Sequence, residues 1–337
     1  MFLGLNLGYL SGRADPSGQL ALAREADRLG YAVVWTAEAY GSDSPSMLAW
    51  LAGQTERIGL GSAVMQIPAR TPAATAMTAA TIDALSGGRF RLGLGVSGPQ
   101  VSEGWHGVRF ADPIARTREY VAIVRKALAR EQLVYDGGHY RLPLPDGAGK
   151  PLKLGFHPPR TEIPIYLAAI GPRNLRLAGE IADGWLAIFL APEHAAGQLA
   201  RIRPTRPGFD VVASVPVVVG DDIGACADLV RWYAALYLGG MGSREQNFYN
   251  QLAVRMGYGD AARRVQDEYL AGRIRNAAAA VPLPFIDQTS LLGPPRRIAD
   301  RLQAYAESGV TTLSVQPLAG DPATLRTVAD AAELAGV

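Results

Sequence analysis

The sequence predicts an α/β fold of the (β/α)8 barrel class with two insertions. Short segments rich in β-branched and aromatic residues alternate with helical segments along most of the 337 residues, and this alternation indicates a parallel sheet. The rhythm gives eight strands with helices between and after them. It breaks at about 132–162, after the fourth strand-helix unit, and at about 239–290, between strands seven and eight. We expect a single barrel domain spanning residues 1–337.

The first four strand-helix units are set by local start and stop signals. Ser17 is the expected N-cap of the first helix and Gly30 its stop, Gly87-Gly88 ends the third helix, and Asp112-Pro113 opens the fourth. The expected strands and helices of this half alternate at 2–7, 17–29, 31–36, 45–55, 57–64, 72–85, 90–96 and 113–129.

The second half contains both insertions. In the first, a β-hairpin is expected to turn at Asp136-Gly137-Gly138. The second holds amphipathic stretches around 245–257 and 259–271, and a lid over a pocket or a dimer interface would explain it equally well. The regular elements expected here are strands at 163–169, 185–190, 211–219 and 310–316, helices at 172–182, 192–202, 295–308 and 322–334, and a helix starting near Asp221 or Asp222.

Composition narrows the function classes. With 33 Lys and Arg against 31 Asp and Glu, no overall field favours nucleic acid or a membrane surface. The single Cys226 excludes an internal disulfide, and four scattered histidines do not suggest a metal site. The N-terminal apolar stretch has no basic start, so we interpret it as a strand rather than a signal peptide, and we expect a cytoplasmic protein without a membrane partner.

The strand ends carry few ionisable groups. In a barrel of this class the chemistry lies at the carboxyl ends of the strands, and there Glu38 is the main acid-base candidate, although a solvated loop carboxylate near Tyr40 and Asp43 is the plainer reading. No metal cluster or nucleophile set accompanies it. A site of backbone, small and apolar residues suggests that a cofactor carries the reaction and the protein positions it.

Gly93, Gly95 and Gly98 formally match the dinucleotide fingerprint G-x-G-x-x-G. That fingerprint opens a helix directly and needs an acidic residue about 20 positions later at a strand end. We expect no helix before Pro113, and positions 118–120 fall inside that helix. The sequence therefore argues against a dinucleotide site.

Other candidate binding residues lie in turns and insertions. At Gly171-Pro172 a strand meets a helix whose free amides could bind phosphate, with Arg173 adding charge, although an ordinary turn is about as good an explanation. The candidates for a substrate pocket, each of which an exposed or solvated position would also explain, are Trp105, His106, Tyr249 and Arg255.

Several segments together resemble the luciferase-like monooxygenase superfamily and, within it, the coenzyme F420-dependent oxidoreductases. Leu-Ser-Gly-Gly-Arg alone marks only the superfamily, whereas the combined set is typical of the F420 branch. The segments that carry the resemblance are residues 34–43, 85–90, 93–100, 103–107, 163–172, 181–185 and 237–242.

The resemblance implies a barrel, usually a homodimer, that binds the deazaflavin F420 across its strand ends. It implies a cis peptide at Ala63-Val64 behind the ring, Gly95, Val96 and Ser97 facing the ring, and phosphate at Gly171-Pro172. The expected cofactor residues are Asn6, Ala63, Val64, Met65, Gly95, Val96, Ser97, Gly98, Ala169, Ile170, Gly171, Pro172 and Arg173.

Departures from the family pattern narrow the expected reaction. Sugar-phosphate dehydrogenases of the family carry an Asp-His pair where this chain has Glu38-Ala39, and a carboxylate where it has Val96. We therefore expect hydride transfer between the deazaflavin C5 and an activated C=C or C=N bond of a small organic substrate, with Glu38 positioning or protonating it. The alternatives are an FMN-dependent monooxygenase and a non-catalytic deazaflavin-binding protein.

Overall fold

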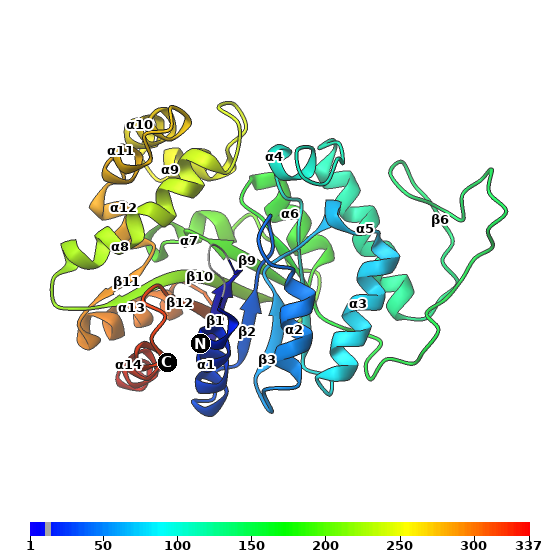
Figure 1. Cartoon of the computed structure of the whole chain (residues 1–337), viewed down its shortest axis with the longest axis horizontal. Helices are drawn as coiled ribbons and strands as arrows, with labels where there is room; N and C mark the ends of the chain where they lie inside the picture. The colour runs from blue at the N-terminus through cyan, green and yellow to red at the C-terminus, as the bar shows by residue number, and fades with distance from the viewer. Residues whose placement is uncertain (11–14) are drawn as a thin grey trace.

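Eight parallel strands close into a barrel, as predicted (Figure 1). The computed structural model describes residues 1–10 and 15–337. Around the barrel the strands follow the order β1-β2-β3-β5-β8-β9-β10-β12, and β12 pairs with β1 to close the ring. The barrel strands are β1 (Phe2–Gly8), β2 (Val33–Thr36), β3 (Gly59–Ser62), β5 (Phe90–Gly95), β8 (Ile165–Ala168), β9 (Gly184–Ile188), β10 (Asp210–Val219) and β12 (Thr312–Pro317).

Helices cover the outside of the barrel. The outward-facing strand residues, such as Leu5 and Val34, are fully buried in one core with the inner faces of these helices. Burial of this alternating face drives the layered packing. The surrounding helices are α1 (Pro16–Arg28), α2 (Ser44–Ala52), α3 (Pro72–Leu85), α5 (Pro113–Leu128), α6 (Pro172–Ile181), α7 (Pro192–Leu199), α8 (Ile223–Ala235), α13 (Pro295–Glu307) and α14 (Pro322–Ala335).

The start of α1 corrects one prediction. The N-cap is Asp15 rather than Ser17: the Asp15 carboxylate accepts a hydrogen bond from the Ser17 amide at 2.9 Å. A carboxylate before a first-turn proline satisfies the amides that the helix leaves free. The predicted stop is confirmed, since Gly30 follows the helix with φ of 80°.

The Leu-Ser-Gly-Gly-Arg motif joins two parts of the barrel. After α3, the chain turns and Arg89 donates hydrogen bonds to four backbone carbonyls, those of Ala52 at 3.0 Å, Thr55 at 3.0 Å, Ile58 at 2.6 Å and Ser86 at 2.6 Å. Five N–H groups in a rigid fork suit a guanidinium to this role. The motif therefore fixes where β5 begins relative to α2 and β3.

Strand three is shorter than the predicted 57–64. It ends at Ser62, and the Ala63-Val64 peptide is cis, as the resemblance implies. Pairing with β5 then resumes in the two-residue strand β4 (Met65–Gln66), which leads into a 3₁₀ turn, η1 (Ile67–Ala69).

A short helix, α4 (Pro99–Ser102), begins directly after Gly98 and was not predicted. The Ser102 amide donates to the Gly98 carbonyl at 2.8 Å, and Pro99 supplies a first-turn φ suited to a helix. The expectation of no helix before Pro113 is therefore wrong. The helix lasts a single turn, and positions 118–120 lie within α5, so the acidic partner of a dinucleotide fingerprint is still missing from its expected place.

The first interruption contains the predicted hairpin. Strands β6 (Tyr135–Asp136) and β7 (Arg141–Leu142) pair antiparallel, and the chain around β6 projects away from the barrel at the right of Figure 1.

The second interruption is mainly helical, and its helices gather at the top left of Figure 1. Helix α8 passes into a π-helical turn, η2 (Leu236–Gly240), and the later helices pack with it in a separate hydrophobic cluster. A strand that was not predicted, β11 (Leu291–Gly293), pairs with the end of β10. The remaining elements are α9 (Phe248–Arg255), α10 (Gly259–Leu270), α11 (Ile274–Ala279) and α12 (Leu283–Gln288). In the described ranges, no helix has the length and apolar character needed to cross a membrane.

Side chains fill the middle of the barrel and form a plug. The rings of Trp35 and Tyr166 meet edge to face, with centroids 5.3 Å apart, and Leu186 and Val212 pack beside them. A Cβ at Gly61 would lie 2.2 Å from the Trp35 ring, so only glycine leaves room for this indole. The plug thus provides the bottom of any cavity at the strand ends.

Candidate active site

Above the plug, the carboxyl ends of the strands enclose two connected chambers. The inner chamber has a volume of about 420 Å³ and lies over β1, β10 and β12. The outer chamber has a volume of about 430 Å³ and lies over the ends of β5 and β8. The residues that line both are Tyr9, Ala37, Tyr40, Ala63, Val64, Ala168, Leu186, Ile188, Tyr237 and Tyr249.

The wall of the outer chamber is built from small residues. Gly95 to Gly98 line it, and Ser97 has the left-handed φ of 63° that lets the chain turn away from β5. The cis Ala63-Val64 peptide lies beside them, and a Cβ at Gly95 would lie 2.5 Å from Val64 Cγ2. The Val64 side chain therefore packs directly against Gly95, and the two residues form an uncharged part of the chamber wall.

The outer chamber reaches the N-terminus of α6. Gly171 is the N-cap, no side chain caps the helix, and a Cβ at Gly171 would meet nothing within 4 Å. Arg255 donates to the neighbouring Ile170 carbonyl at 3.3 Å. Burial lowers the pKa of Arg255, and the nearby Arg201 lowers it further. Free helix amides beside guanidinium groups suit an anion.

The inner chamber has an aromatic wall that comes mainly from α8, η2 and α9. Tyr237 packs against Tyr233 and Tyr249 with ring centroids 4.9 Å and 4.8 Å apart, and Phe189 supports all three from behind. Burial raises the pKa of each tyrosine, to about 12 for Tyr249. The wall is therefore uncharged and rigidly packed.

The opposite side of the inner chamber is polar. Asn6 Nδ2 donates to Ser214 Oγ at 2.6 Å, and the Gly8 amide holds Asn6 Oδ1 at 2.8 Å. Ser314 is the register partner of Ser214 on the adjacent strand, and Gln316 also lines this side. Together these side chains, with the two serines at its centre, form what we call the polar corner.

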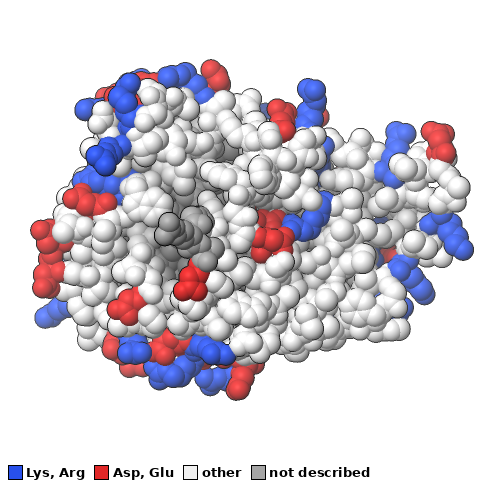
Figure 2. Space-filling model, in the orientation of Figure 1, with Lys and Arg blue, Asp and Glu red and all other residues white. Residues whose placement is uncertain are grey.

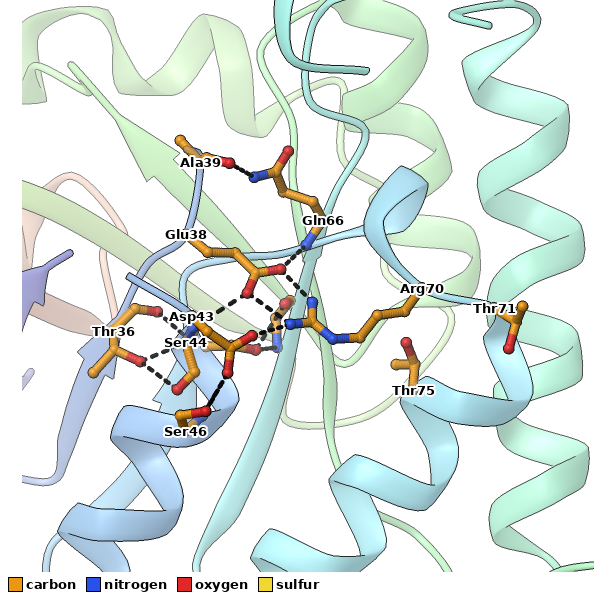
Figure 3. A network of polar contacts seen from close by, with 12 residues as sticks. Thr36, Glu38, Ala39, Asp43, Ser44, Ser46, Gln66, Arg70, Thr71 and Thr75 are labelled. Carbon is orange, nitrogen blue, oxygen red and sulfur yellow. Dashed lines mark hydrogen bonds and ion pairs between the residues drawn. The ribbon is translucent and has the colours of Figure 1, made fainter. Parts of the chain in front are cut away.

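Among the described residues that line the outer chamber, Glu38 is the one with a charged side chain, and Figure 3 shows its contacts. Its carboxylate, with a side chain 7% exposed, accepts from Arg70 Nη1 at 2.5 Å and Arg70 Nη2 at 3.1 Å. It also accepts from the amides of Ser44 at 3.2 Å and Gln66 at 2.9 Å, while Arg70 pairs with Asp43 as well. These bonds tie the loop after β2 to the segment that follows the cis peptide.

Gln66 adds a second tie and an unused acceptor. Its Nε2 donates to the Ala39 carbonyl at 2.8 Å, whereas its Oε1 is buried with no hydrogen-bond partner among the described residues. The amide oxygen belongs to a residue that lines the outer chamber. Buried acceptors are normally satisfied, so this one is available to a ligand.

Many charged side chains lie toward the edges of the face shown in Figure 2, and a group of acidic and basic side chains also lies near its centre. Among residues 1–10 and 15–337, no group of three or more His, Cys, Asp or Glu is placed to hold a metal ion.

The model of the luciferase-like monooxygenase family matches residues 2–312. The chain belongs to this family. It is 44% identical to a Mycobacterium tuberculosis protein assigned by name to the coenzyme F420-dependent oxidoreductases, over 94% of each chain. It is 31% identical to 5,10-methylenetetrahydromethanopterin reductase of Archaeoglobus fulgidus, covering 88% of this chain and 87% of that one. The predicted resemblance to the F420 branch is confirmed.

Solved structures support the fold independently. The F420-dependent tetrahydromethanopterin reductase of Methanopyrus kandleri superposes with a TM-score of 0.81 over 97% of each chain, at 22% sequence identity. At that identity the match shows a shared barrel architecture, which agrees with the family assignment.

In this family member, most of the predicted site residues gather at the chambers. The outer chamber is lined by Glu38 and by nine of the predicted cofactor residues, and Tyr249 lines both chambers. Asn6 lies in the inner chamber instead of the outer one. Those nine cofactor residues are Ala63, Val64, Gly95, Val96, Ser97, Gly98, Ala169, Ile170 and Gly171.

The other predicted site residues do not line either chamber. Met65 is buried in the outer core, because alternation along β4 points it away from the chambers, and Pro172 and Arg173 are exposed on α6. Trp105 is 67% exposed in the turn after α4, and His106 follows it there. Arg255 lies at the Gly171 turn rather than at a substrate pocket.

Sequence reasoning missed most of the aromatic wall and part of the polar corner. Trp232, Tyr233, Leu236 and Tyr237 all line the inner chamber from one face of α8 and η2. Their spacing is the i, i+1, i+4, i+5 pattern of a helix face, a signal that was available in the sequence. Ser314 gives no local signal, because its place depends on β12 lying beside β10.

Proposed function

We propose that the chain binds coenzyme F420 in the outer chamber and is an F420-dependent oxidoreductase. Hydride would pass between the deazaflavin and an activated C=C or C=N bond of a small organic molecule in the inner chamber. The observation that carries the proposal is that Ala63 and Val64 line both chambers, where an outer chamber walled by small residues meets an uncharged inner cavity. The F420-dependent enzymes among the relatives support the choice of cofactor.

The outer chamber suits this cofactor on three grounds. The wall formed by Val64 and Gly95 is uncharged and has no side chain at position 95, so a flat ring can lie against it. The unpartnered Gln66 Oε1 offers an acceptor to a ring N–H group. The uncapped start of α6 at Gly171, with Arg255 beside it, offers amides and charge to a phosphate.

When bound, the deazaflavin supplies or accepts the hydride. The chain orients the reactants: Ala63 and Val64 support the ring side, and Tyr237 and Tyr249 form an apolar wall of the inner chamber. Glu38 was predicted to position or protonate the substrate, whereas its contacts favour a role in positioning the chain segments around the chamber. Its two oxygens already accept four hydrogen bonds, so the carboxylate has no free hydrogen to direct at a substrate.

Parallel titrations with oxidised F420 and FMN test the cofactor, followed by oxidation of reduced F420 in the presence of unsaturated acceptors. We expect F420 to bind more tightly than FMN, and we expect the absorbance of oxidised F420 to return when the enzyme passes the hydride of reduced F420 to an acceptor. Tighter binding of FMN would support the monooxygenase alternative. F420 binding without hydride transfer to any acceptor would support the non-catalytic one. The homodimer stays a prediction that light scattering would test.

A further inference from the structure

The polar corner of the inner chamber contains hydrogen-bond donors that the protein does not use. Ser214 Oγ accepts from Asn6 at 2.6 Å, so the Ser214 hydroxyl hydrogen remains free to donate elsewhere. Ser314 is 1% exposed, and its Oγ has no hydrogen-bond partner among the described residues. The Trp35 Nε1 group, in the plug below, also lacks one there.

Leaving these polar groups without hydrogen-bond partners lowers the stability of the folded protein. A buried polar atom left without a partner destabilises a fold by about 1 to 3 kcal/mol, and native structures contain few of them. The indole N–H of Trp35 can only donate, and the two hydroxyls can donate through their free hydrogens. The matching ligand group is therefore an acceptor, such as a carbonyl oxygen.

The remainder of the inner chamber restricts the charge of the ligand. No Lys, Arg, Asp, Glu or His lines it within the described ranges, and its wall is formed by Trp232, Tyr233, Tyr237 and Tyr249. A charged group placed here would lose its hydration without gaining a counterion, which costs several kcal/mol. Aromatic faces instead favour apolar or aromatic surface.

We propose that the inner chamber binds an uncharged, largely apolar α,β-unsaturated ketone whose carbonyl oxygen accepts hydrogen bonds from Ser214 and Ser314. This inference rests on the proposed function and names its substrate class. Hydride from the reduced deazaflavin adds to the β-carbon, the C=C π electrons move toward the carbonyl oxygen, and a proton from solvent reaches the α-carbon. Donors at the polar corner stabilise the negative charge that develops on the oxygen.

Binding to the chain without cofactor tests the inference with three matched probes. They are 4-phenylbut-3-en-2-one, the diene in which a CH₂ group replaces its carbonyl oxygen, and the anion cinnamate. We expect the ketone to bind about 2- to 10-fold more tightly than the diene, the value of one or two modest hydrogen bonds. Cinnamate should bind most weakly.

Two serine variants locate the effect. Ser314→Ala should remove most of the preference for ketone over diene. Ser290→Ala is the control, because Ser290 is also buried without a hydrogen-bond partner in the described chain but does not line either chamber. It should leave the preference intact. Both variants should keep or raise the melting temperature, since each removes an unsatisfied hydroxyl.

Equal binding of ketone and diene, tightest binding of cinnamate, or equal effects of the two variants would each overturn the inference. F420 titration of the same proteins keeps the two proposals apart. If the unmodified chain does not bind F420, the proposed function is contradicted. If it binds F420 but shows no preference for the ketone over the diene, only the substrate class is contradicted.

Discussion

Replacing Glu38 by glutamine separates its positioning role from a catalytic one. In Glu38→Gln, the remaining oxygen can keep two of the four hydrogen bonds, and the new NH₂ group faces the other two donors, the Ser44 amide and Arg70 Nη2. Arg70 keeps Asp43 as a partner, so its charge is not left alone. The substitution therefore breaks part of a largely buried network without creating an isolated buried charge.

The size of the effect follows from these lost contacts. Hydrogen bonds that involve charged groups contribute about 1.5 to 3 kcal/mol each. Partial exposure of Arg70 and the remaining Asp43 contact reduce the total, and we expect a loss of about 2 to 4 kcal/mol. With an unfolding entropy of about 2.1 cal/mol/K per residue, or about 0.7 kcal/mol/K for 337 residues, the melting temperature should fall by about 3 to 6 °C.

Denaturant unfolding, F420 titration and turnover should be measured on the same preparations. The control is Glu180→Gln, which breaks a mostly exposed pair with Arg118 and should cost at most about 1 kcal/mol. We expect Glu38→Gln to be less stable than the control and to bind F420 more weakly, because loss of the Ser44 and Arg70 Nη2 contacts loosens the loop after β2, which lines the outer chamber. If stability and F420 binding match the control while turnover falls by about 10²-fold or more, Glu38 is a catalytic residue and the positioning argument fails.

Three further outcomes follow from the chambers. Gly95→Ala should weaken F420 binding in a titration, because its Cβ would lie 2.5 Å from Val64 Cγ2 and would displace Val64 from the chamber wall; unchanged affinity would mean that this wall does not contact the ring. Gln66→Leu should weaken F420 binding in a titration, because it removes both the unpartnered Oε1 acceptor and the Nε2 contact with Ala39; unchanged affinity would mean that Oε1 does not contact the cofactor. Burial raises the pKa of Tyr249 to about 12, above its ordinary value of 10. The stability that the protonated tyrosine contributes is complete below about pH 10 and is lost as pH rises through about 12. The free energy of unfolding should therefore fall by about 2 to 3 kcal/mol over this range. Denaturant unfolding from pH 9 to 12 in Tyr249→Phe should show a smaller alkaline loss than the unmodified chain, and identical losses would contradict the burial argument.

The order of barrel strands could be predicted because each strand-helix unit carries its own local signals. Helix α3 has the predicted bounds, and its glycine stop lies where the sequence places it, with φ of 66° at Gly87. Strand β11 was not predicted, because Leu291–Gly293 is extended only through its pairing with the end of β10, which lies more than 70 residues earlier in the chain. Such pairing is non-local and leaves no periodic pattern in three residues.

The residues of the candidate site also fall into those that could be predicted from the sequence and those that could not. Backbone features at strand ends, such as Gly95 and Gly171, were predictable because barrel topology alone brings strand ends together. Side-chain partners were not: the sequence suggested a solvated or catalytic Glu38 and gave no indication of its bond to Arg70, which lies 32 positions away. The prediction that Trp105 lines a pocket was wrong, because an aromatic residue beside a glycine-rich loop gives the same sequence signal whether the loop turns inward or, as here, leaves the side chain exposed.

The pairing of Trp35 with Gly61 has a consequence for how such enzymes diversify. The indole lines the inner chamber but not the outer one, and its position depends on the missing side chain at 61. A relative with a smaller residue at 35 gains depth for a longer substrate and at the same time becomes free to lose the glycine at 61. The two positions should therefore covary across relatives, while the wall formed by Gly95 and Val64 stays constant. The length of the substrate that fits can then change through substitutions at positions 35 and 61 alone, while the cofactor stays the same.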